Sequence, residues 1–213
     1  MTKKRAVLFD FDGVVMDTEP QYTLFWDRIG KEYLPQYEDF GRIIKGQTLD
    51  AIYRKYFAGM EAEQPLITER LNRYEQSMDY TYVPGVERFM ESLKAQGVKT
   101  AIVTSSNRQK MANVYAAHPE LEQRVDRILT AEFFTRSKPA PDCFLLGAEI
   151  FGVQPHECVV FEDSFHGLQA GRAAGMTVVG LSTTHPAEAI ADKCRLVIPD
   201  FQDFTYEKMC ELF

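Results

Sequence analysis

The chain of 213 residues has no apolar run of about 18 residues, the length that a membrane-spanning helix needs. Its first residues, MTKKR, precede an apolar stretch of only strand length, which is too short for the centre of a signal peptide. The cysteines at positions 143, 158, 194 and 210 lack the close spacing of zinc ligands or of a disulfide framework. These absences favour a cytoplasmic protein with free thiols and no membrane partner.

The chain also lacks a basic stripe, and its formal net charge is -7. A protein that binds DNA or RNA needs clustered positive charge against the phosphate backbone, so no nucleic-acid partner is expected. An acidic protein can still bind a small anion where a lysine or a metal ion reverses the local field. No internal repeat or low-complexity segment is visible, and we expect a monomer.

What the sequence does contain is an alternation of strand and helix patterns. Apolar runs without polar alternation indicate buried parallel strands at 6–9, 100–104, 127–129, 158–161, 177–181 and 195–198. Helical spacing occurs at 86–96, 108–117, 143–151, 167–174 and 206–212, with glycines at 97, 152 and 175 where helices should end. The alternation predicts an α/β fold with a doubly wound, Rossmann-like parallel sheet, which binds ligands at the carboxyl ends of its strands.

One region breaks this alternation. Between residues 17 and 83 no segment reads as a buried strand, whereas helical patterns occur at 21–33, 48–57 and 68–78. We therefore expect an all-helical cap domain at 17–83, inserted into a discontinuous α/β core formed by 1–16 and 84–213. Because the insertion leaves the core just after the first strand, it would cover the ligand site as a lid.

The stretch DFDGVVMDTE, residues 10–19, follows the first predicted strand. Strand side chains alternate, so Asp10 and Asp12 would face the same side. Two like charges on one face persist in a folded protein only if a cation, a shared proton or strong hydrogen-bond donors compensate for them. The pair therefore indicates a metal site or an acid–base role.

Further polar residues follow other predicted strands and loops. They are Thr104, Ser105, Ser106 and Asn107 after the second strand, Glu162 and Asp163 after the fourth, and Lys138 in the loop SKPAPD at 137–142. Two prolines fix the backbone after Lys138. We expect all these groups to converge on one crevice that holds carboxylates, hydroxyls and an ammonium.

The segments DFDGVVMDTE, VTSSN, SKPAPD and FEDS resemble the four motifs of the haloacid dehalogenase (HAD) superfamily, in the right order and positions. The resemblance covers almost the whole chain and is to the phosphatase and β-phosphoglucomutase-like branch with a helical cap, subfamily I. A lone D-x-D-G would be a weak signal, but four ordered matches are specific. The resemblance implies a hydrolase that transfers the phosphoryl group of a small phosphorylated metabolite through an aspartyl-phosphate, with Mg²⁺ as cofactor.

The resemblance also implies a role for each matching catalytic residue. Asp10 would be the nucleophile, since a carboxylate needs no deprotonation at neutral pH. Asp12 would protonate the leaving alkoxide and then activate water against the phosphoenzyme. Thr104 would donate a hydrogen bond to a phosphoryl oxygen, and Lys138 would balance the charge between Asp10 and the phosphate.

A magnesium ion prefers oxygen ligands, which Asp10, the backbone carbonyl of Asp12 and Asp163 would supply. Glu162 would act either directly on the metal or by orienting its ligands. We assign phosphate or substrate binding to Gly13, Glu19, Ser105, Ser106 and Asn107. Gly13 would allow the sharp turn after Asp12, and backbone amides at a helix start would follow Thr104.

Other polar residues also have simple structural interpretations. Asp17 and Thr18 are interpreted as caps of the first lid helix, and Glu19 either as part of that cap or hinge or as a group facing the substrate. Trp26 is interpreted as lid core rather than a sugar-stacking platform. Ser164 is interpreted as the N-cap that secures the metal loop.

Three functions follow from these residues. The first is a Mg²⁺-dependent phosphatase, with a sugar phosphate as the expected substrate, and the second is a β-phosphoglucomutase. The third is a phosphate-binding module without catalysis, which the intact set Asp10, Asp12, Lys138 and Asp163 disfavours.

Two positions weigh against the mutase. The family's mutases place a histidine shortly after the D-T pair and an arginine after a K-G-x-S element of the lid. The corresponding positions here are Tyr22 and, after KGQT, Leu49. Neither side chain supplies a cation for a second phosphate. Lys45, Arg54 and Arg70 are the alternative lid cations.

Overall fold

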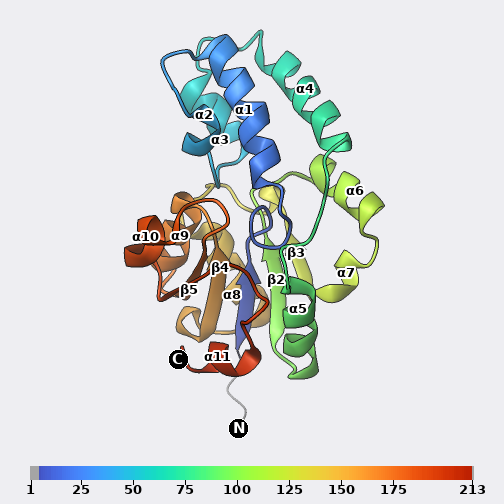
Figure 1. Ribbon diagram of the computed structural model, residues 1–213, viewed down its shortest axis with the longest axis vertical. Coiled ribbons are helices and arrows are strands. Elements are labelled where there is room, and N and C mark those ends of the chain that lie inside the picture. Colours follow the sequence, from blue (N-terminus) through green and yellow to red (C-terminus); the bar gives the residue numbers. More distant parts are fainter. Residues whose placement is uncertain (1–4, 213) are drawn as a thin grey trace.

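The apolar runs form a parallel sheet in the computed structural model, which describes residues 5–212 (Figure 1). The sheet has six strands in the order β3-β2-β1-β4-β5-β6. They are β1 (Ala6–Phe9), β2 (Lys99–Val103), β3 (Arg127–Leu129), β4 (Cys158–Glu162), β5 (Thr177–Leu181) and β6 (Leu196–Ile198). The predicted fold class is confirmed, and the predicted strand boundaries differ by a residue at β2, β4 and β6.

Helices connect the strands and cover both faces of the sheet. They are α5 (Val86–Ala95), α6 (Arg108–Ala117), α7 (Leu121–Arg124), α8 (Asp142–Phe151), α9 (Phe165–Ala173), α10 (Ala187–Ile190) and α11 (Tyr206–Cys210), with the short 3-10 helices η1 (Ala131–Phe133), η2 (Pro155–Glu157) and η3 (Ala191–Lys193). The last helix ends before the predicted residue 212. Among residues 5–212, none of the helices has both the length and the apolar character needed to cross a bilayer.

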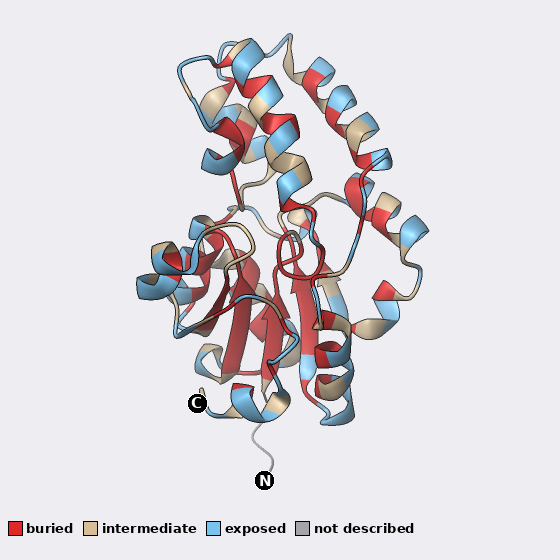
Figure 2. Ribbon diagram, viewed as in Figure 1, coloured by how far each residue is buried: buried red, intermediate tan, exposed pale blue. Residues whose placement is uncertain are grey.

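The central strands are buried on both faces, as Figure 2 shows by their uniform red colour. Val7 and Phe9 point into one apolar cluster, which includes residues of α5 and α11. Ala6 and Leu8 point into the opposite cluster, which includes residues of α8 and α9. This two-sided burial explains why the strand sequences are apolar without alternation.

The remaining helices form a separate group above the carboxyl ends of the strands (Figure 1). They are α1 (Glu19–Tyr33), α2 (Phe40–Ile43), α3 (Leu49–Tyr56) and α4 (Gln64–Gln76). Their apolar side chains, including Trp26, Phe40, Phe57 and Ile67, form a cluster of their own. We call α1–α4 the cap helices; the domain boundaries at residues 17 and 83 remain a prediction.

The two chain segments that join the cap helices to the sheet run side by side. The backbone N–H of Asp17 donates to the carbonyl of Thr81 at 2.8 Å, and that of Val83 donates to the carbonyl of Val15 at 2.9 Å. These bonds place the start of α1 directly above the end of β1. The cap therefore begins close to Asp10 and Asp12, the two acidic residues that follow β1.

Candidate active site

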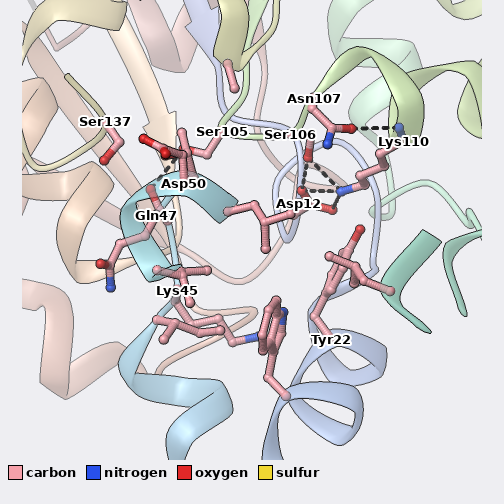
Figure 3. Close-up of a pocket in the computed structure, with 18 of the residues that line it drawn as sticks. Asp12, Tyr22, Lys45, Gln47, Asp50, Ser105, Ser106, Asn107, Lys110 and Ser137 are labelled. Atoms are coloured by element: carbon pink, nitrogen blue, oxygen red, sulfur yellow. Dashed lines mark hydrogen bonds and ion pairs between the residues drawn. The ribbon is translucent and has the colours of Figure 1, made fainter. Parts of the chain in front are cut away.

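A cavity of about 480 Å³ lies between the carboxyl ends of the strands and the cap helices (Figure 3). We call two parts of its lining the floor and the roof. The floor consists of Asp10, Asp12, Ser105, Ser106, Asn107 and Lys110. The roof consists of Tyr22, Trp26, Leu49, Ile52, Leu71 and Glu75. Both expected aspartates therefore face the same cavity.

Asp10 directly follows β1, and its backbone N–H donates to the carbonyl of Phe161 at 2.9 Å. This bond extends the pairing of β1 with β4 and fixes the position of the carboxylate. The ammonium of Lys138 donates to Asp10 Oδ1 at 2.6 Å. Burial raises the pKa of Asp10 to about 7, although Lys138 acts in the opposite direction. A buried carboxylate with one cation beside it is thus held at the strand end.

Asp12 is held by donors from three directions. Ser106 Oγ donates to Asp12 Oδ2 at 3.0 Å, and the hydroxyl of Thr18 and the ammonium of Lys110 make short contacts with the same carboxylate. Burial raises the pKa of Asp12, but the Lys110 ammonium and the hydrogen bonds together lower it below its usual value. Asp12 is therefore an ionised carboxylate in this arrangement.

The expectation that Thr18 caps the first lid helix by its side chain is wrong. Thr18 is the residue before α1, but its side chain makes no hydrogen bond to the backbone of the helix start. The hydroxyl instead donates to the carboxylate of Asp12. The backbone of Thr18 is already helical, with φ -101° and ψ -14°, rather than in the extended conformation from which an N-cap oxygen accepts a backbone N–H of the first turn. The N-cap expected at Ser164 is confirmed, since Ser164 Oγ accepts from the N–H of Gly167 at 3.0 Å.

Three buried carboxylates lie close enough to hold one metal ion. Single oxygens of Asp10, Glu162 and Asp163 all lie within 4.8 Å of one another. Burial, helped by the neighbouring carboxylates, raises the pKa of Asp163 well above its usual value. Packed carboxylates of this kind suit a hard cation with oxygen ligands, so the residues present fit Mg²⁺.

Glu162 is already occupied by protein donors. Its Oε1 accepts from the ammonium of Lys138 at 2.6 Å. Its Oε2 accepts from the backbone N–H groups of Asp163 and Ser164 at 2.8 and 2.9 Å. These contacts suit a residue that orients Lys138 and the loop after β4, which leaves Asp10 and Asp163 as the freer carboxylates.

Gly13, which was expected to bind phosphate or substrate, lies against Asp163. It is not one of the described residues that line the cavity. Its φ is +75°, and a Cβ atom at this position would lie 2.1 Å from Asp163 Oδ2. Any larger residue would therefore displace a carboxylate of the acidic cluster. Gly13 thus acts on the site through its size and backbone conformation.

The segment after β2 brings three of its four expected residues to the cavity. Ser105, Ser106 and Asn107 line it, whereas Thr104 is only 1% exposed and lies behind them. Thr104 Oγ1 accepts from the N–H of Ser106 at 3.0 Å, which shapes the turn. Asn107 caps α6, since its Oδ1 accepts from the N–H of Lys110 at 2.9 Å. The proposed contact of Thr104 with phosphate stays a prediction.

Comparison with known proteins agrees with this geometry. The family model for haloacid dehalogenase-like hydrolases matches residues 4–175. Hexitol phosphatase A of Escherichia coli is 30% identical over 213 residues, covering 96% of this chain and 94% of the relative. β-Phosphoglucomutase of Bacillus subtilis is 31% identical over 223 residues, covering 97% and 94%. The chain belongs to the haloacid dehalogenase-like hydrolases.

A second phosphatase and a solved structure extend this similarity. The fructose-1-phosphate phosphatase YqaB of E. coli is 33% identical over 179 residues, covering 82% of this chain and 94% of the relative. A family IA HAD hydrolase from Entamoeba histolytica superposes with a TM-score of 0.82 at 27% identity, covering 98% of both chains. This HAD-like hydrolase is therefore similar to both phosphatases and phosphoglucomutases.

The sequence analysis missed Lys110, which lies at the centre of the floor. Its side chain is buried, with its ammonium 2.8 Å from Ser106 Oγ and in contact with Asp12. The same ammonium lies 4.5 Å from the centre of the Tyr22 ring in the roof (Figure 3). The sequence gives no sign that this lysine points inward, because its partner Asp12 lies 98 residues away in the chain.

Glu19 and Lys45 close one side of the cavity. The ammonium of Lys45 donates to the backbone carbonyl of Glu19 at 2.9 Å and also pairs with its carboxylate. Burial lowers the pKa of Lys45 to about 8. Ser105 Oγ donates to the carbonyl of Gly46 at 2.9 Å, which joins the loop after Ile44 to the floor. Glu19 thus lines the cavity while tying α1 to this loop.

Trp26 belongs both to the cap core and to the roof of the cavity. It belongs to the apolar cluster of the cap, as the sequence predicted, and its ring centre lies 5.3 Å from that of Phe25. It also lines the cavity. The alternatives weighed for Trp26 therefore do not exclude each other, because the underside of the cap core is also the ceiling of the site.

Proposed function

We propose that this HAD-like hydrolase is a Mg²⁺-dependent phosphatase that hydrolyses a small phosphomonoester, a sugar phosphate, through an aspartyl-phosphate on Asp10. The observation that carries the proposal is the floor of the cavity. There the buried carboxylate of Asp10 lies 2.6 Å from the Lys138 ammonium, Asp12 lines the same cavity, and Asp163 belongs to the same acidic cluster as Asp10. A protein that only bound phosphate would need neither the nucleophile nor a second carboxylate for proton transfer.

In the first step, an oxygen of Asp10 forms a bond to phosphorus and the bond from phosphorus to the substrate oxygen breaks. Lys138 offsets the repulsion between the attacking carboxylate and the phosphate. Asp12 delivers a proton to the departing alkoxide. Because the pKa of Asp12 is lowered, the proton that it delivers is brought by the substrate, which binds as a phosphomonoester monoanion and passes its acidic proton to Asp12.

In the second step, water attacks phosphorus and the bond to Asp10 breaks, which regenerates the nucleophile. Asp12 takes a proton from the attacking water, and its lowered pKa suits a carboxylate that starts this step ionised. Ser105, Ser106 and Asn107 offer donors to the phosphoryl oxygens from the start of α6. The cap contacts around Gly46 keep bulk water away from the floor.

Asp10, Asp163 and the backbone carbonyl of Asp12 would hold Mg²⁺ in this proposal. When bound, the ion neutralises negative charge on the phosphate. Glu162 would act indirectly, because its oxygens already accept from Lys138 and from the loop after β4.

A β-phosphoglucomutase is the second candidate, since relatives of that name are about as similar as the phosphatases. The roof favours the phosphatase. The hydroxyl of Tyr22 donates to Glu75 at 2.8 Å, and Leu49 is apolar. Both positions therefore lack the cation that a second phosphate would require.

The alternative lid cations, Arg54, Arg70 and Lys45, do not supply the missing cation for a second phosphate. Arg54 pairs with Asp50 on an exposed surface, and Arg70 pairs with Glu32, also exposed. Neither arginine lines the cavity within the described part of the chain. Lys45 does, but it is engaged by Glu19. A bisphosphate would leave its second phosphate without a partner in the roof.

The deciding experiment uses β-glucose 1-phosphate with a trace of the bisphosphate as primer, in the presence of Mg²⁺. We expect release of inorganic phosphate and no accumulation of glucose 6-phosphate in a coupled dehydrogenase assay. A dehydrogenase signal that outruns phosphate release would establish the mutase instead. Absence of any turnover of p-nitrophenyl phosphate would favour the non-catalytic module.

A further inference from the structure

We infer that Glu75 is a specificity-determining residue, which restricts substrates to monophosphates whose distal part carries a hydroxyl group and no second negative charge. The inference rests on the proposed phosphatase function and names the substrate class of the same cavity. It concerns the roof, whereas the proposed chemistry takes place on the floor.

Glu75 is a buried carboxylate at the end of α4 that lines the cavity. Only 4% of the residue is exposed. The hydroxyl of Tyr22 donates to Glu75 Oε1 at 2.8 Å, and this is the one hydrogen bond that the carboxylate makes within the described residues. Burial raises the pKa of Glu75, whereas Lys110 and the bond from Tyr22 act in the opposite direction. An acceptor oxygen is therefore available at the roof for a hydroxyl of the substrate.

The two cations that line the cavity are already paired with carboxylates other than Glu75. Lys45 and Lys110 are the only cations among the described residues of the cavity lining. Lys110 contacts Asp12, and Lys45 contacts Glu19, so each is balanced by a carboxylate near the floor. A carboxylate or second phosphate on the distal part of a substrate would lie near the Glu75 carboxylate with no unpaired cation in the described cavity lining to offset it. Burying such a charge is strongly unfavourable.

The rest of the roof is apolar. Trp26, Leu49, Ile52 and Leu71 line the same cavity as this carboxylate and present hydrocarbon and an indole ring to it. A sugar or polyol presents C–H groups to such a wall while one hydroxyl reaches the acceptor. A neutral hydroxylated chain thus fits both features of the roof, and an anionic chain fits neither.

Sorbitol 6-phosphate and 6-phosphogluconate provide a matched test, because they differ only at C1, which is an alcohol in the first and a carboxylate in the second. Both lose phosphate from the same carbon, so the leaving groups are equivalent. We expect kcat/KM of the wild-type enzyme with Mg²⁺ to favour sorbitol 6-phosphate by about 100-fold. Equal values, or a preference for 6-phosphogluconate, would overturn the inference without touching the proposed chemistry.

The variant Glu75→Gln keeps the size of the side chain and an acceptor oxygen but removes the charge. We expect the ratio of the two kcat/KM values to fall to about 10-fold or less, mainly through a lower KM for 6-phosphogluconate. Glu69→Gln is the control, since Glu69 lies on the same helix, is exposed and pairs with Arg73. It should leave the ratio unchanged. An unchanged ratio in Glu75→Gln, or an equal fall in Glu69→Gln, would contradict the assignment.

Binding measurements separate this inference from the proposed function. If the wild-type enzyme hydrolyses none of sorbitol 6-phosphate, 6-phosphogluconate and p-nitrophenyl phosphate, the phosphatase proposal fails. Calorimetric titration of the Asp10→Asn variant with sorbitol 6-phosphate and with 6-phosphogluconate still compares the affinities of the cavity for the two compounds. Tighter binding of sorbitol 6-phosphate would support the role of Glu75, and equal binding would contradict it.

Discussion

The floor and the roof of the cavity are built in opposite ways. On the floor, the charged groups that line the cavity lie beside groups of opposite charge: Asp10 beside Lys138, and Asp12 beside Lys110. In the roof, one buried carboxylate bonded by a tyrosine lies among apolar side chains. We therefore assign the proposed chemistry to the floor and the proposed selection of substrates to the roof. Changes on the floor should therefore affect every substrate, and changes in the roof only some.

The largest effect is expected for Asp10→Asn, which removes the proposed nucleophile while keeping the volume of the side chain. Turnover should fall by about 10³-fold or more on all phosphomonoesters, because no other carboxylate at the strand end can take its place. Steady-state rates and the far-ultraviolet circular dichroism spectrum would be measured together. Activity close to that of wild type in a folded variant would contradict the proposed mechanism.

Removal of the metal should also abolish activity toward every substrate. EDTA should abolish activity, Mg²⁺ should restore it, and Ca²⁺ should not, since its larger and looser shell misaligns the reacting groups. The variant Asp163→Ala should raise the Mg²⁺ concentration for half-maximal activity by about 10-fold or more. Full activity after extensive dialysis against EDTA would exclude the metal.

Asp12→Asn should discriminate between leaving groups. An alkyl phosphate needs protonation as its oxygen departs, so its turnover should fall by about 10²–10⁴-fold. p-Nitrophenyl phosphate needs little protonation, and its first step should suffer less. Burst kinetics would measure the first step for both substrates. Equal losses in that step would argue against an acid role for Asp12.

The smallest effect is expected from a charge placed in the roof. Leu49→Arg supplies a cation where the described roof has none, so inhibition by a sugar bisphosphate should become about 10-fold tighter. Leu24→Arg, on the exposed side of α1, is the matched control. A similar gain in both variants would show that general charge, rather than the roof position, is responsible.

The floor could be predicted from the sequence to a large extent because strand ends in a parallel sheet meet at one edge. Asp10, Asp12 and Asp163 follow strands, Lys138 lies in a loop fixed by two prolines, and the structure brings the four together. Lys110 could not be predicted in the same way. Its inward position brings its ammonium to Asp12, a residue far from it in the chain, and no local pattern around Lys110 indicates that contact.

The roof could not be predicted beyond its apolar character. A helical pattern predicts which face of α1 or α4 is buried, but the cap core and the cavity ceiling share that face. Trp26 shows the consequence, since it belongs to the cap core and also lines the cavity. Glu75 is a polar residue on the buried face of α4. Only the structure shows that it lines the cavity and accepts a hydrogen bond from Tyr22. Short α2 was also missed, because four residues carry no helical period.

The covalent step on Asp10 is the central claim, and trapping the intermediate tests it most directly. The enzyme would be mixed with excess substrate and Mg²⁺, quenched in acid within the first turnover, digested and examined by mass spectrometry. We predict one added phosphoryl group on the peptide that contains Asp10, and none in Asp10→Asn. A phosphoryl group on another residue such as Ser105, or no modified peptide during rapid turnover, would contradict the assignment of Asp10 as the nucleophile.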